Sequence, residues 1–114
     1  MDETELGELP IFDKVATLDR LDGDVELFAE LIQMFKADSS QQLAQLASML
    51  SALQAMDAYK MAHAIKGSLG NLGAMRAHRV ALEIEREGKA GRCDTALLER
   101  LKAEISAYLV AVEK

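Results

Sequence analysis

One histidine in this sequence stands among residues that suit it for covalent chemistry. The segment His63-Ala-Ile-Lys66-Gly67-Ser68-Leu-Gly70 places a lysine and two glycines shortly after the imidazole. A neutral imidazole is a good nucleophile, because the ordinary pKa of histidine lies just below neutral pH. Attack of a ring nitrogen on phosphorus gives a phosphoramidate bond, from which the phosphoryl group can be passed on. A lysine within reach would stabilise the phosphoryl oxygens. The pattern therefore points to transient phosphorylation of His63.

A helix must present these residues, and we predict it from about Ala55 to Leu72, with Gly73 as its stop. At about 100° per residue, His63 points away from the apolar arc. Glycine in an exposed helix costs about 1 kcal/mol relative to alanine. We therefore interpret Gly67 and Gly70, on the face of His63, as clearing the approach of a docking partner. The other residues of this outer face are Lys66 and, one or two turns earlier, Met56, Tyr59 and Lys60.

The rest of the chain is predicted to be helical, with no strand pattern and no repeat. We expect a short helix over 11–21, and longer helices over 24–53, 75–87 and from residue 94 or 95 to residue 112. The polar stretch 38–40 is taken as part of one continuous helix, and residues 88–91 as a loop. Residues 1–10 are acidic and aperiodic, so we expect a frayed lead-in or linker before a domain over 11–114. Such helices predict an all-α fold, an antiparallel up-down-up-down four-helix bundle with a short extra N-terminal helix.

Composition excludes several classes of function. The net charge of −6 argues against binding to nucleic acid, which needs clustered Lys and Arg. No apolar stretch approaches the ~20 residues that span a bilayer, and the single Cys93 suits a reducing compartment. We therefore expect a cytoplasmic domain, either free or tethered through a larger protein. Since the sequence has no nucleotide loop and no metal-ligand cluster, we expect no cofactor, no metal and no enzymatic activity of its own.

The stretch from His63 to Ala74 closely resembles the signature of histidine-containing phosphotransfer (HPt) domains, the His-to-Asp relay modules of two-component signalling. That pattern has Lys-Gly at the third and fourth positions after the His, then small residues, and Gly-Ala or Gly-Leu ten residues on; this sequence has Gly73-Ala74 there. The resemblance extends to the lead-in over 12–24, to Phe35 and to the pair Leu82-Glu83. It covers about residues 11–112.

The resemblance implies that His63 accepts a phosphoryl group through Nε2, that Lys66 neutralises its oxygens and that Gly67 keeps the approach open. It implies response-regulator receiver domains as partners, with a histidine kinase as a further candidate, and Mg²⁺ only in the receiver domain. A monomer suits a carrier that docks partners in turn. The residues assigned to partner binding are Phe35, Met56, Tyr59 and Lys60.

Several alternatives stay open. Ser68 either makes a nearby hydrogen bond or is a tolerated small residue. Glu85 either orients the His63 ring through Nδ1 or is a solvated charge that would repel a phosphoryl group. His78 is expected on the surface. As a whole, the chain is a free-standing relay protein, a module of a hybrid sensor kinase, a phosphoacceptor domain related to that of chemotaxis kinases, or an adaptor bundle that binds receiver domains without phosphate.

Overall fold

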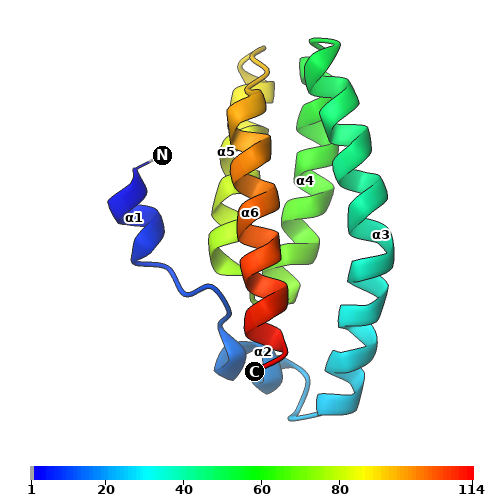
Figure 1. Ribbon diagram of the computed structural model, residues 1–114, viewed down its shortest axis with the longest axis vertical. Coiled ribbons are helices and arrows are strands. Elements are labelled where there is room, and N and C mark those ends of the chain that lie inside the picture. The colour runs from blue at the N-terminus through cyan, green and yellow to red at the C-terminus, as the bar shows by residue number, and fades with distance from the viewer. Residues whose placement is uncertain (1) are drawn as a thin grey trace.

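The computed structural model describes residues 2–114, and these residues form helices and turns without any strand. The predicted all-helical class is therefore confirmed. Figure 1 shows the long helices side by side, each running opposite to the one before it, and the short helices at the N-terminal end of the chain. The six helices are α1 (Glu3–Gly7), α2 (Lys14–Arg20), α3 (Val25–Ser51), α4 (Ala55–Asn71), α5 (Met75–Lys89) and α6 (Thr95–Val112).

Aspartate side chains fix where four of the described helices begin, and Asp2 does so for α1 by accepting the Thr4 N–H at 2.9 Å. Asp13, Asp24 and Asp94 each accept a hydrogen bond from a backbone N–H in the first turn of α2, α3 and α6, at 3.2, 2.9 and 2.9 Å. Such caps satisfy amides that have no partner inside the helix. Helix α3 continues through residues 38–40 without a break, as predicted. Residues 52–54 and 72–74 form tight turns, which force α4 to run antiparallel to both α3 and α5.

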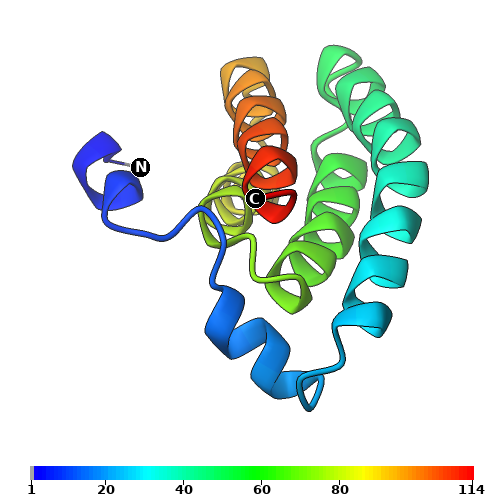
Figure 2. The same ribbon diagram turned by 60° about the horizontal axis from the view of Figure 1, so that its bottom comes forward.

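Helix α2 closes the end of the bundle at which α3 begins and α4 ends (Figure 2). Gly73 has φ of +75°, and a Cβ there would lie 2.1 Å from the hydroxyl oxygen of the buried Thr17, so only glycine fits. Its carbonyl accepts the Asp13 N–H at 2.9 Å. Arg20 donates to the carbonyls of Gly70 and Asn71 at 3.2 Å each, which satisfies the last turn of α4. The end of the helix that carries His63 is thus anchored.

Several helix bounds differ from the sequence prediction. Helix α2 begins at Lys14 instead of residue 11, and α3 ends at Ser51 instead of residue 53. Residues 3–7 form α1, although no helix was expected there; Leu6 is buried and packs against the bundle. Helix α5 runs two residues further than predicted, to Lys89, because Gly88 is not a loop residue. A Cβ on Gly88 would lie 2.8 Å from the carbonyl oxygen of Ala55 and 3.1 Å from Cβ of Tyr59. The missing side chain lets α5 pack directly on α4.

None of the helices within residues 2–114 is long and apolar enough to cross a bilayer.

Candidate functional site

His63 lies near the middle of α4 on its exposed face. Its side chain is 64 % exposed. The residues on the opposite side of α4 are almost fully buried: Ala58, Ala62, Ile65 and Leu69. The prediction that His63 would point away from the core and remain accessible is confirmed.

The imidazole is held from the side by a carboxylate of the neighbouring helix. Nδ1 of His63 lies 3.2 Å from Oε2 of Glu85 on α5. The same oxygen lies 2.8 Å from Nζ of Lys66. Glu85 is only 14 % exposed and Lys66 only 20 %, so neither is a freely solvated charge. One carboxylate oxygen therefore joins the lysine and the histidine.

The charges of this trio support one another. Burial by itself would raise the pKa of Glu85, but the hydrogen bonds from Lys66 and His63 outweigh it and leave this pKa below its usual value. Glu85 is thus a carboxylate at neutral pH. A neutral His63 satisfies it best with a proton on Nδ1, because only a protonated nitrogen can donate to the carboxylate. That tautomer leaves the lone pair of Nε2 free for chemistry.

Comparison with known proteins gives this arrangement a family. The family model of the Hpt domain matches residues 30–111, which include nearly all of α3 and all of α4 and α5. The chain belongs to the Hpt domain family. No curated protein and no solved structure matches it. Hpt domains are histidine phosphocarriers of phosphorelays, in which they interact with receiver domains and kinases. The resemblance drawn from the sequence is confirmed at this level.

Several residues of α4 surround His63 on the exposed face of this Hpt domain. The ring of Tyr59 stacks near the imidazole, with centroids 6.5 Å apart and an interplanar angle of 26°. Met56 is 58 % exposed, and Lys60 and Gly67 are also exposed. A Cβ on Gly67 would meet no atom of residues 2–114 within 4 Å beyond its own helical turn. The space beside His63 is therefore open on the Gly67 side.

Gly70 has a different role from the one predicted. A Cβ on Gly70 would lie 3.2 Å from Cδ2 and 3.6 Å from Nε2 of His78, on α5. The interpretation of Gly70 as a clear path for a partner is therefore wrong, because this space is already filled from within the domain. His78, expected on the surface, is half-buried in the groove between α4 and α5.

Phe35 does not lie on the exposed face of α4. It is only 7 % exposed, and its ring packs edge-on against Tyr108, with centroids 6.5 Å apart. Its assignment to the partner-binding surface is corrected accordingly: the apolar ring serves the core. Ser68 is half-buried and lines a groove of about 440 Å³ between α2, α3 and α4, together with Arg20 and Asn71.

The sequence contains a signal for the groove that the helical wheel of α4 alone did not reveal. His63 and Gly70 are seven residues apart on α4, and His78 and Glu85 are seven residues apart on α5. In two antiparallel helices, this spacing places His63 opposite Glu85 and Gly70 opposite His78. Within residues 2–114, no group of three or more His, Cys, Asp or Glu side chains is placed to hold a metal ion.

Proposed function

We propose that this Hpt domain carries a phosphoryl group on Nε2 of His63. It accepts the group from the aspartyl phosphate of a receiver domain or from a kinase, and passes it to the Asp of a response regulator. The observation that supports this most directly is an exposed imidazole whose Nδ1 lies 3.2 Å from an oxygen of the largely shielded Glu85 carboxylate. An exposed histidine without such a partner would have no fixed tautomer.

Glu85 acts as the positioning residue for the nucleophile. As the Nε2 lone pair attacks phosphorus, the Nε2–P bond forms, the bond between phosphorus and the aspartyl oxygen breaks, and its electron pair stays on the departing carboxylate. Positive charge then grows on the ring, which still holds its proton on Nδ1. The hydrogen bond from Nδ1 to Glu85 strengthens at that moment, so it stabilises the transition state more than the resting state.

Lys66 supplies the balancing positive charge. In the resting domain its ammonium is neutralised by Glu85 at 2.8 Å, beside the imidazole. When a phosphoryl group is bound to His63, the ammonium is close enough to turn to the phosphoryl oxygens, a charge-assisted contact. The domain itself offers no further machinery. The receiver domain would bring the Asp, the Mg²⁺ and most of the transition-state stabilisation.

The exposed face of α4 supports docking of a receiver domain. Met56, Tyr59 and Lys60 precede His63 on this face, and Gly67 follows it with open space above. A flat surface of mixed apolar and basic character around an accessible nitrogen allows another protein to reach that nitrogen with its own active site. We propose that the domain binds its partners one at a time, as a monomer.

Transfer from a phosphorylated receiver domain tests this function. The wild-type domain should gain one acid-labile, alkali-stable phosphoryl group, seen as a mass increase, and His63→Gln should gain none while remaining folded by circular dichroism. ATP alone should phosphorylate neither protein. Binding of the receiver domain without any phosphoryl transfer would refute the carrier and favour the adaptor. Phosphorylation from ATP alone would show that the chain has kinase activity of its own.

A further inference from the structure

A second histidine occupies the groove that contains the phosphoacceptor site. His78 and Glu85 lie on the same face of α5, and Gly70 and His63 lie on the face of α4 opposite them. The His78 ring fills the space that the absent Gly70 side chain leaves, with Cδ2 3.2 Å from the Cβ position. The chemistry proposed at His63 assigns no role to this ring.

Lys66 lies on α4 between His63 and Gly70, the glycine on which the His78 ring packs, and it holds Glu85 at 2.8 Å. Burial lowers the pKa of His78, the Lys66 charge lowers it further, and the Glu85 charge opposes them only in part. The other charged group at this end is Arg20 of α2, whose guanidinium donates to the carbonyl of Gly70. His78 is therefore uncharged at neutral pH. In the proposed function, the nearby Lys66 exchanges its contact with Glu85 for a contact with the phosphoryl group.

We propose that His78 is the proton-linked partner of His63: phosphorylation of His63 and protonation of His78 favour each other through the Lys66–Glu85 pair. This inference rests on the proposed function of His63. It assigns to His78 a role in setting how strongly the domain holds its phosphoryl group, apart from the covalent chemistry.

The coupling follows from the change in charge at His63. The phosphoryl group adds two negative charges and the substituted ring, with its Nδ1 proton, adds one positive charge, so the groove becomes more negative by about one unit. Lys66 turns toward the phosphoryl oxygens, so His78 experiences a less positive field and takes up a proton from water more readily. Because linkage is reciprocal, protonation of His78 must favour the phosphorylated domain by the same free energy.

The two rings can be followed separately, since the sequence has only two histidines. Nuclear magnetic resonance would record the titration midpoint of the His78 ring before and after phosphorylation with phosphoramidate, with His63→Gln used for assignment. In that reaction, the P–N bond of phosphoramidate breaks, ammonia leaves and the Nε2–P bond forms. We expect phosphorylation to raise the midpoint of His78 by on the order of half a pH unit. Normal phosphorylation with an unchanged midpoint would refute the linkage alone.

Variants test the same coupling without phosphate. In the unphosphorylated domain, Lys66→Met should raise the midpoint of His78 and Glu85→Gln should lower it. Gly70→Ala should shift the midpoint because it displaces the ring, whereas the matched change Gly67→Ala, which meets no described neighbour, should leave it unchanged. If Lys66→Met left the titration midpoint of His78 unchanged, the inference would be overturned even if His63 were phosphorylated normally. If wild-type His63 gained no acid-labile phosphoryl group, the proposed function would fail and the linkage with it.

Discussion

The chemistry of this domain is organised by one oxygen atom. Oε2 of Glu85 contacts both Nδ1 of His63 and Nζ of Lys66. In the proposed function, this oxygen fixes the tautomer of the nucleophile and places a cation beside it. Because Glu85 is largely buried, its interactions are less weakened by solvent than those of a surface charge would be. His63 is exposed, while Glu85, the group that we propose orients it, is protected by the packing of α4 and α5.

Replacing Glu85 by Gln tests this arrangement. The amide keeps the size of the side chain but removes the charge, so a charge-assisted hydrogen bond becomes a neutral one. The charge-assisted hydrogen bond is stronger than the neutral one by about 1.4 kcal/mol. We therefore expect phosphoryl transfer between domain and receiver to slow roughly tenfold. Single-turnover kinetics with a phosphorylated receiver domain would measure it. Glu83→Gln is the matched control, since Glu83 is also 14 % exposed on α5 but pairs with Arg79 and Arg86. Equal rates in all three proteins would exclude a positioning role for Glu85.

The lowered pKa of His78 predicts how stability depends on pH. An unfolded chain binds a proton on this ring near the ordinary value of about 6.5, whereas the folded domain binds it only at lower pH. Between these two values the unfolded state holds more protons, so the domain loses stability as the pH falls below about 6.5. Urea unfolding of wild type and His78→Gln at about pH 7.5 and about pH 5.5 would isolate this ring. We expect the free energy of unfolding to fall less in His78→Gln than in wild type between these two pH values. Equal losses in the two proteins would show that His78 has an ordinary pKa.

At the scale of helices, α4 and α5 use glycine differently. Gly88 is buried and permits contact between backbones, with the Ala55 carbonyl and Tyr59 against it. Gly67 is exposed and makes no such contact within the described residues. Since glycine weakens a helix interior, Gly67 lowers the stability of α4 without any gain in packing. We therefore propose that function rather than folding explains its presence.

Alanine at Gly67 should therefore raise stability and lower activity. We expect Gly67→Ala to increase the free energy of unfolding by about 0.5–1 kcal/mol, because alanine favours the helix. A methyl group at the centre of the docking face should slow transfer to a receiver domain by roughly tenfold if it costs about 1.4 kcal/mol of contact. Urea unfolding and transfer kinetics would measure the two effects. Gly88→Ala supplies the contrast, with an expected loss of about 1–3 kcal/mol in stability. Faster or unchanged transfer in Gly67→Ala would mean that partners do not approach on this side.

The sequence was sufficient for the long helices but not for their contacts. Periodicity predicted the helices that became α3, α4 and α6, because an apolar stripe is a local property. The outward direction of His63 followed from the same wheel. Gly70 and Gly88 were misinterpreted because a glycine in one helix can be explained only by what the next helix places against it. Phe35 was misplaced for the same reason: its burial depends on Tyr108, which is distant in sequence.

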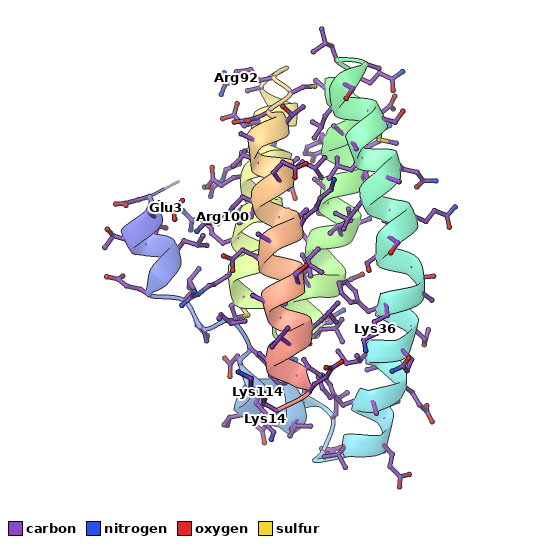
Figure 3. All side chains as sticks on the ribbon, viewed as in Figure 1. Glu3, Lys14, Lys36, Arg92, Arg100 and Lys114 are labelled. Carbon is purple, nitrogen blue, oxygen red and sulfur yellow. The ribbon has the colours of Figure 1, made fainter. Side chains whose placement is uncertain are left out.

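At the scale of the whole molecule, the N-terminal segment, residues 3–9, packs on the side of α5 away from His63. We call this segment the strap. Glu3 and Arg100 point toward one another across the gap between α1 and α6 (Figure 3), and their two hydrogen bonds measure 2.7 and 2.6 Å. Arg79 binds Glu5, and Arg76 donates to the carbonyls of Gly7 and Leu9. Leu6, 1 % exposed, is the apolar anchor of α1. The segment lacked a sequence signal because its partners lie 67 to 97 residues away along the chain.

This placement predicts that the strap contributes to stability and not to phosphoryl transfer. Truncating the buried side chain in Leu6→Ala should lower the free energy of unfolding by about 2 kcal/mol or more, since a cavity forms where the leucine packed. The control Val15→Ala changes a side chain that is 83 % exposed and should alter stability by no more than about 0.5 kcal/mol. Both variants should transfer phosphoryl groups at the wild-type rate under conditions where they are folded, because the contacts of α1 to α5 and α6 lie outside the groove of His63 and Glu85. Slower transfer in Leu6→Ala alone, with the fold intact, would show that α1 extends the partner surface.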